Sequence, residues 1–206
     1  MEVKQGKIIA LVGAPRSGKS YLTDLLAKHY SAISMHEGEV SDFPKRILED
    51  IEKNIRPLER IIWFRNQAIK RYADALKLKE EGKMIVMDTF WITYQLYIDT
   101  LLEGFEKELM LECAALDRKT LPWPDKIIFL RIDEKGIRNF IKKGARTFDQ
   151  SEDFIKNQAL PVNEMHNNFF SKKENLENLF IVNRGDLDFS KLEDLSMLIK
   201  RIDDPK

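Results

Sequence analysis

The loop at residues 13–20 carries the clearest chemical pattern in the chain. Its sequence, GAPRSGKS, has the spacing of a phosphate-binding loop. Gly13 and Gly18 can adopt backbone angles that side chains forbid, so successive N–H groups can turn toward a phosphate. Lys19 can reach the β- and γ-phosphates of a nucleotide, and the Ser20 hydroxyl can ligate Mg²⁺. The residues expected to bind ATP here are Gly13, Ala14, Pro15, Arg16, Ser17, Gly18, Lys19 and Ser20.

Two carboxylates follow other apolar runs. Asp88 comes directly after residues 84–87. A carboxylate at that strand end can hold Mg²⁺ together with Ser20, and capping a helix N-terminus is the alternative, compatible role. Glu37 follows the run at residues 32–35 and could orient an acceptor or take its hydroxyl proton. A solvated loop acid is the alternative for Glu37.

One helical face beyond Pro57 combines an aromatic ring, an amide and a guanidinium. Gln67 and Arg71 are four residues apart, and Phe64 lies one turn earlier. Such a face suits a nucleobase together with a phosphate or sugar. Ordinary core packing for Phe64 and a solvated face for Arg71 are the alternatives.

Basic residues gather around residues 138–146. A mobile basic segment there, a lid at about 142–153, could close over the phosphate being transferred. Arg146 is the expected catalytic residue of this lid, and Arg138 is expected to contact the nucleotide. Arg16, inside the phosphate-binding loop, also points toward the reacting phosphates, whereas a charged helix end is the alternative for the basic segment.

Alternating strands and helices must position these residues. Apolar runs predict strands over 8–12, 32–35, 84–87, 127–130 and 179–182. Helical patterns cover 19–29, 43–53, 57–80, 91–116, 134–143, a stretch from Glu152 that Pro161 could kink, and 192–202. This alternation predicts an α/β fold of three layers: a five-stranded parallel sheet flanked by helices, in one domain over 1–206. The strand before the phosphate-binding loop and the helix after it distinguish that loop from a chance glycine-rich turn. Ligands of such folds bind outside the carboxyl ends of the strands, so the candidate residues should share one crevice.

The composition narrows the function classes. The 206 residues include 34 basic and 34 acidic side chains, a balance that argues against coating nucleic acid or an anionic membrane. Neither a signal peptide nor an apolar run of about 20 residues is visible. The single cysteine, Cys113, excludes an intramolecular disulfide and fits a reducing cytoplasm. The three histidines show no metal-binding spacing.

The order of these parts resembles the thymidylate kinase and deoxynucleoside kinase family of P-loop kinases, over nearly the whole chain. Arg16 stands where some thymidylate kinases carry a catalytic arginine, and Glu37 where deoxynucleoside kinases place a catalytic glutamate. The segment from Asp88 to Tyr97 resembles the Asp-Arg-Tyr…Tyr segment of thymidylate kinases, which implies acceptor contacts by Phe90 and Tyr97. The resemblance also implies that the segment Asn183-Arg184-Gly185 closes over the adenine of ATP, with Asn183 as a nucleotide contact.

The resemblance implies ATP- and Mg²⁺-dependent transfer of a γ-phosphate to a nucleoside monophosphate. A deoxynucleoside acceptor is the nearest alternative, and a catalytically weakened regulatory protein that binds nucleotide is the next, because Thr89 replaces the family arginine after the strand-end acid. An ATPase coupled to a partner fits the short, neutral chain less well. The family also suggests a homodimer through the long helices, with no nucleic acid or membrane partner.

Overall fold

The computed structural model describes residues 5–38, 42–143, 152, 155–173, 176–185 and 187–203. Five strands form its central sheet, in the order β2-β3-β1-β4-β5, and every neighbouring pair is parallel. The strands are β1 (Lys7–Gly13), β2 (Ile33–Met35), β3 (Met84–Asp88), β4 (Lys126–Arg131) and β5 (Leu179–Asn183). The predicted five-stranded parallel sheet is therefore confirmed.

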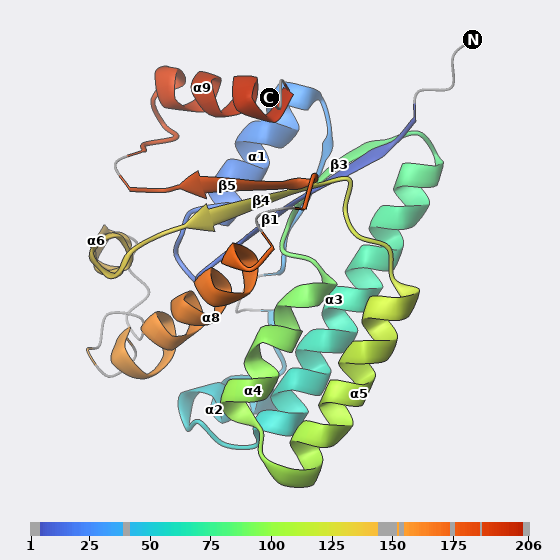
Figure 1. Ribbon diagram of the computed structural model, residues 1–206, viewed down its shortest axis with the longest axis vertical. Coiled ribbons are helices and arrows are strands. Elements are labelled where there is room, and N and C mark those ends of the chain that lie inside the picture. Colours follow the sequence, from blue (N-terminus) through green and yellow to red (C-terminus); the bar gives the residue numbers. More distant parts are fainter. Residues whose placement is uncertain are drawn as a thin grey trace.

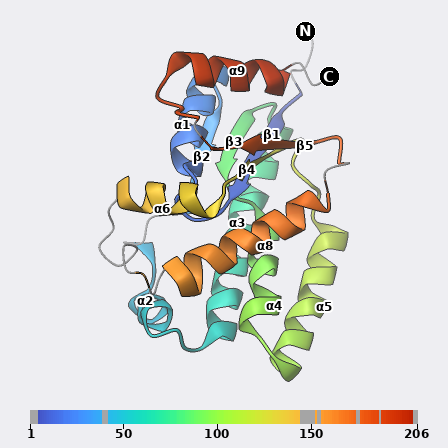
Figure 2. The same ribbon diagram turned by 60° about the vertical axis from the view of Figure 1, so that its left-hand side comes forward.

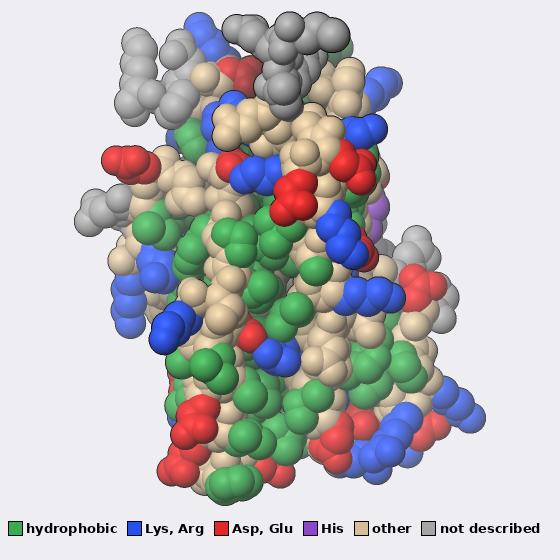
Figure 3. Space-filling view, turned by 90° about the vertical axis from the view of Figure 1, so that its right-hand side faces the viewer, with side chains coloured by type: hydrophobic (Ala, Val, Ile, Leu, Met, Phe, Trp, Pro, Cys, Tyr) green, Lys and Arg blue, Asp and Glu red, His purple; other side chains and the backbone are tan. Residues whose placement is uncertain are grey.

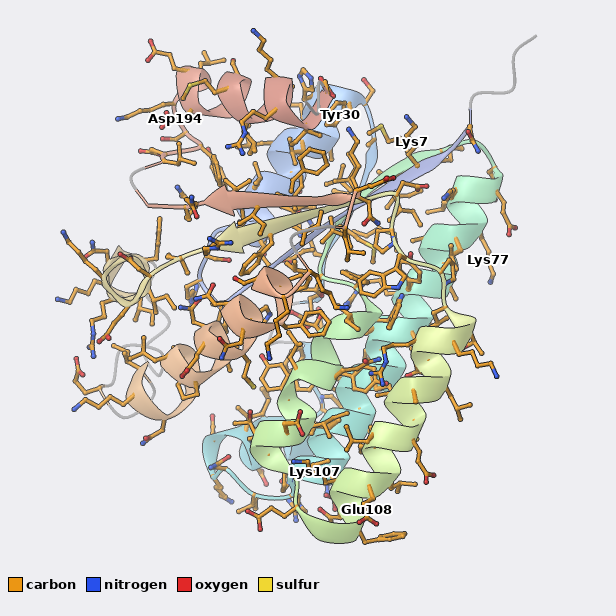
Figure 4. The ribbon with its side chains drawn as sticks, viewed as in Figure 1. Lys7, Tyr30, Lys77, Lys107, Glu108 and Asp194 are labelled. Carbon is orange, nitrogen blue, oxygen red and sulfur yellow. The ribbon has the colours of Figure 1, made fainter. Side chains whose placement is uncertain are left out.

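Helices cover both faces of this sheet (Figures 1 and 2). On one face lie α1 (Lys19–Tyr30) and α9 (Leu192–Asp203), which share a hydrophobic cluster with β1 and β4. The hydroxyl of Tyr30 on α1 (labelled in Figure 4) also donates to Asp203 of α9, at 2.8 Å. On the other face lie α3 (Pro57–Glu80), the 3₁₀ helix η2 (Trp91–Tyr97) and α8 (Leu160–Ser171). The three-layer arrangement leaves the carboxyl ends of the strands at one edge.

The remaining helices extend from these layers. They are α2 (Lys45–Glu52), α4 (Ile98–Leu101), α5 (Gly104–Thr120), α6 (Glu134–Lys143) and the π-helical turn η4 (Ile155–Ala159). Within the described residues, no helix combines the length and apolar character needed to cross a bilayer.

The helix predicted over residues 91–116 is interrupted. Its first part is the 3₁₀ helix η2, followed by the short α4, and α5 begins only at Gly104. Leu102 is extended and 2% exposed, packed in a cluster with Ile61 and Met110, and Gly104 has a positive φ of 52°. Burial of Leu102 therefore competes with helical periodicity, and the glycine allows the chain to reverse so that α4 and α5 lie side by side (Figure 1).

The sequence suggested a kink at Pro161, and the structure has a change from π-helix to α-helix there. It lies in the first turn of α8, directly after the π-helical turn η4. Ala159 has right-handed helical angles, so the chain stays helical from η4 into α8, and the missing N–H of Pro161 falls where the π-helical turn gives way to the α-helix. The helix expected to continue from Glu152 is thus divided at Leu160, while part of the stretch between them lies outside the described residues.

Candidate active site at the carboxyl edge of the sheet

The phosphate-binding loop links the end of β1 to the start of α1. Gly13, Arg16 and Gly18 have positive φ angles of 150°, 66° and 90°. A Cβ added to Gly13 would lie 2.9 Å from the backbone oxygen of Leu130, so this position requires glycine where the loop passes β4. Helix α1 begins at Lys19, immediately after the loop, and its positive end faces the loop. The backbone has the form of an anion cradle.

Lys19 lies across this loop. Its ammonium donates to the backbone oxygens of Gly13 at 3.1 Å and of Ala14 at 3.0 Å. These two bonds hold the ammonium over the cradle, where an incoming polyphosphate would meet it. The geometry gives Lys19 the placement that the sequence predicted, and its role in binding phosphate stays a prediction.

Asp88 and Ser20 form a pair that can hold a cation. The Ser20 hydroxyl donates to Oδ2 of Asp88, whose side chain is buried at the end of β3. The second oxygen, Oδ1, is buried without a hydrogen-bond partner. A buried, acceptor-only oxygen beside a hydroxyl fits Mg²⁺, a hard cation that prefers oxygen ligands. No group of three or more acidic, histidine or cysteine side chains among the described residues forms a metal site of its own. Phosphate oxygens and water would have to supply the remaining ligands.

Glu37 and Arg71 face each other across the acceptor side. One guanidinium N–H of Arg71 donates to the backbone oxygen of Glu37 at 2.9 Å, and another approaches the Thr89 hydroxyl at 3.5 Å. Glu37 keeps exposed surface, so a ligand can reach it. Protein atoms crowded around its carboxyl raise the pKa of Glu37, the charge of Asp88 adds to this, and Lys19 and Arg71 oppose it. A carboxylate with a raised pKa is suited to accept a proton.

His36 and Tyr97 lie in the surroundings of Glu37. The Nε2 atom of His36 lies 2.8 Å from Oδ1 of Asp24 on α1, so the residue before Glu37 is tied to that helix. Tyr97 is half-buried at the end of η2. Burial and the nearby charge of Glu37 both raise the pKa of the Tyr97 phenol. The predicted contact of Tyr97 with the acceptor stays a prediction.

The face of α3 brings only Arg71 into contact with these groups. Gln67 is exposed, and Phe64 is half-buried with its ring edge-on to Phe43 and Trp63, at centroid distances of 5.6 and 4.9 Å. Phe64 thus takes part in aromatic packing. The expectation that Phe64 and Gln67 read a nucleobase stays a prediction.

The predicted substrate contact by Phe90 is wrong. Its side chain has no exposed surface and packs edge-on against Trp91 and Trp123, both at 5.7 Å. The preceding Thr89 has a φ of 65°, and its N–H donates to the backbone oxygen of Leu11 at 2.9 Å. This bend at the end of β3 turns Phe90 into the hydrophobic core.

The predicted nucleotide contacts at the far end of the sheet stay predictions. Arg138 of α6 donates to Glu134 at 2.8 Å and to both carboxylate oxygens of Glu152 at 3.0 Å, and these bonds raise its pKa. Asn183 ends β5 with an exposed side chain. Arg146, with residues 144–151 and 153 of the predicted lid, lies outside the described residues.

The sequence placed Arg184 only within the segment 183–185 that the family resemblance sets near adenine, with no phosphate contact. Arg184 is 5% exposed, and its Nε donates to the backbone oxygen of Ser17 in the phosphate-binding loop, at 3.3 Å. The signal in the sequence was weak: an arginine directly after a strand whose carboxyl end faces the site.

The phosphate-binding loop, the Ser20–Asp88 pair and the strand order of the sheet define a P-loop domain. The chain matches the model of a family described as an AAA domain over residues 8–169, and it belongs to that family. A search of curated protein sequences gave no match.

Solved structures place the fold among nucleoside and nucleotide kinases. Deoxyadenosine kinase from M. mycoides with bound dATP is similar with a TM-score of 0.71 at 16% identity, over 96% of this chain and 100% of that one. Thymidylate kinase from Candida albicans gives 0.67 at 17% identity, over 97% and 92% of the two chains. The NadR protein in complex with NR gives 0.59 at 16%, over 96% of this chain and 49% of that one. The resemblance to P-loop nucleoside and nucleotide kinases is confirmed as a likeness of fold.

Proposed function

We propose that the protein transfers the γ-phosphate of ATP to a hydroxyl of a deoxynucleoside, with Mg²⁺. The observation that carries this proposal is the position of the Glu37 carboxylate, which has a raised pKa and senses the charge of Asp88 in the Ser20–Asp88 pair. Arg71 holds the backbone of Glu37 by a hydrogen bond to its carbonyl oxygen. A base for a hydroxyl and a cradle for a polyphosphate are the two parts that phosphoryl transfer to an alcohol needs.

The donor side has a division of roles. Backbone N–H groups of residues 13–20 hold the phosphate chain, and Lys19 neutralises charge on the transferred group. Ser20 and Asp88 hold Mg²⁺, which when bound supplies further charge neutralisation. Arg16 and Arg146 remain proposed contributors to the reacting phosphate, and Arg138 and Asn183 remain proposed contacts of the nucleotide.

The acceptor side favours an uncharged substrate. Thr89, buried and bonded to the main chain, stands where the resemblance places an arginine that helps hold the acceptor or its phosphate. Arg71 already donates to the Glu37 carbonyl. Burial raises the pKa of Glu37 and the charge of Asp88 adds to this, so the further negative charge of a monophosphate would be unfavourable beside these two groups.

A nucleoside monophosphate is the second candidate acceptor. The Nε of Arg71 is buried without a hydrogen-bond partner, and a guanidinium in that state can pair with a phosphate oxygen. In both readings Phe64, Gln67 and Tyr97 would contact the base or sugar of the acceptor.

Product formation tests the proposal directly. The purified protein is incubated with ATP, Mg²⁺ and each member of a panel of deoxynucleosides and nucleoside monophosphates, and products are separated by chromatography. We expect a deoxynucleoside monophosphate to accumulate together with ADP. Tight ATP binding without turnover of any acceptor, or ATP hydrolysis alone, would contradict the kinase proposal.

We also propose that the chain is a single domain that forms a homodimer and works in the cytoplasm. Apolar side chains gather on the face formed by α3 and α5 (Figure 3), and Ile62, Leu109 and Leu116 are 38%, 38% and 61% exposed. Exposed apolar patches commonly mark contacts between proteins. Light scattering after size-exclusion chromatography is expected to give twice the mass of the chain, and the mass of one chain would contradict the dimer.

A further inference from the structure

Arg184 occupies a fixed place beside the phosphate-binding loop. Its backbone N–H donates to the oxygen of Arg131 at 2.7 Å, one residue beyond the end of β5. Its side chain extends toward the start of α1, where a Cβ built on Gly18 would lie 3.7 Å from its Nε and 3.8 Å from its Nη2. With the bond from Nε to the oxygen of Ser17, these contacts place the guanidinium against the last two residues before α1.

Two aromatic rings fix the plane of this guanidinium. Its central carbon lies 4.5 Å from the ring centroid of Phe140 on α6 and 4.2 Å from that of Phe189. These two cation–π contacts cover part of the guanidinium, and its N–H groups donate hydrogen bonds along its edge. Nε on that edge is used by Ser17, whereas Nη1 is buried without a hydrogen-bond partner.

The charge of Arg184 is not balanced by a close carboxylate among the described residues. Burial lowers its pKa, and Asp188 and Asp194 oppose this only as longer-range charges. Arg65, by contrast, is a partly buried arginine with a carboxylate partner, since Asp117 lies 2.5 Å from it. Burying a cation without an anion costs free energy, and the faces of aromatic rings replace lost hydration only in part.

We infer that Arg184 binds the phosphate chain of the donor nucleotide. Its free N–H edge pairs with a phosphate oxygen next to residues 17 and 18, so a nucleoside polyphosphate supplies the anion that the buried guanidinium lacks. The inference rests on the proposed function, because it requires the donor to bind the phosphate-binding loop.

Calorimetric titration of Arg184→Met with adenosine, ADP, ATP and inorganic tripolyphosphate tests this inference. A charge-assisted hydrogen bond predicts a loss of about tenfold or more in affinity for ATP and tripolyphosphate, and no loss for adenosine. Arg184→Lys, which keeps the charge but not the planar fork, should lose less. Arg118→Met is the matched control, because Arg118 donates to Gln95 in the helical layer on the far side of the core.

Thermal unfolding without nucleotide separates binding from a structural role. Met keeps apolar contact with both rings and removes the unbalanced charge, so the midpoint of Arg184→Met should not fall below the wild-type value. Equal losses for adenosine and ATP, or unchanged ATP affinity with a lowered midpoint, would overturn the inference. If the wild-type protein bound no ATP at all, the proposed function itself would fail, whatever the variant did.

Discussion

The substitution Glu37→Gln separates a proton acceptor from a side chain that only holds the substrate. Gln has the size of Glu but cannot take the hydroxyl proton. The bond from Arg71 goes to the backbone oxygen of residue 37, so it survives the change and keeps the loop in place. Loss of a general base typically costs about 10² to 10⁴ in rate. We expect kcat to fall by that factor, which is about 2.7 to 5.4 kcal/mol in activation free energy.

The pH dependence of the activity also tests the role of Glu37 as the base. Crowding around the carboxyl and the charge of Asp88 raise the pKa of Glu37. The base works only when ionised, so activity should be full at high pH and fall as the pH drops through this raised pKa. The acidic limb therefore lies above the ordinary glutamate value of about 4.3. In Glu37→Gln the limb should disappear, because the group that titrates is gone.

Steady-state turnover of the active acceptor over a pH series measures both effects. Glu80→Gln is the matched control, since Glu80 is exposed at the end of α3 and should leave kcat and the acidic limb unchanged. Wild-type kcat in Glu37→Gln, or an acidic limb that persists in it, would refute the assignment of Glu37 as the base.

Three further substitutions test separate parts of the structure. Arg71→Met removes a cation that lowers the pKa of Glu37, so the acidic limb of the rate profile should move to higher pH; a shift to lower pH would contradict this. Asp88→Asn keeps the bond to the serine hydroxyl but removes the charge for the metal, so a Mg²⁺ titration of activity should show a higher half-saturating concentration, and an unchanged one would exclude a metal role. Asp117→Ala removes the carboxylate that Arg65 and the buried Tyr94 share, so the free energy of unfolding measured in urea should fall by about 3 to 5 kcal/mol. The control Asp74→Ala, on the exposed side of α3, should lower it by about 0.5 kcal/mol or less.

Much of the fold could be predicted because its signals are local. The strands buried on both faces appear as unbroken apolar runs, and helix α3 was predicted with its observed bounds because Pro57 marks its start and Gly82 follows its end. The order β2-β3-β1-β4-β5 could not be read in the same way. A run of apolar residues identifies a strand but does not say which neighbour it will pair with.

The interruption before α5 shows where periodicity is insufficient. Leu102 fits a helical pattern in the sequence, but in the structure it is extended because its burial against Ile61 and Met110 is a long-range contact. Phe90 was assigned to the acceptor from its place in a family segment. The positive φ of Thr89, which turns that ring into the core, depends on the pairing of β3 with β1.

In the candidate site, too, local features could be predicted and long-range contacts could not. The phosphate-binding loop is one continuous segment, so its spacing was sufficient to identify it. The position of the Arg184 guanidinium is set by the rings of Phe140 and Phe189 and by the backbone of Ser17. Phe140 and Ser17 are far from Arg184 in the sequence, so no short pattern predicts this arrangement. The contact between Arg71 and the Glu37 backbone likewise joins two candidates that the sequence could only propose separately.

Calorimetric titration of ATP into the wild-type protein and into Lys19→Ala tests the central claim most directly. The Lys19 ammonium donates to the backbone oxygens of Gly13 and Ala14, so the substitution removes a positive charge for the phosphates and two hydrogen bonds within the loop. Lys28→Ala, an exposed change on the same helix, is the control. We predict that ATP affinity falls by about tenfold or more in Lys19→Ala and is unchanged in the control. Equal affinity of Lys19→Ala and the wild-type protein for ATP would contradict a phosphate-binding role for this loop.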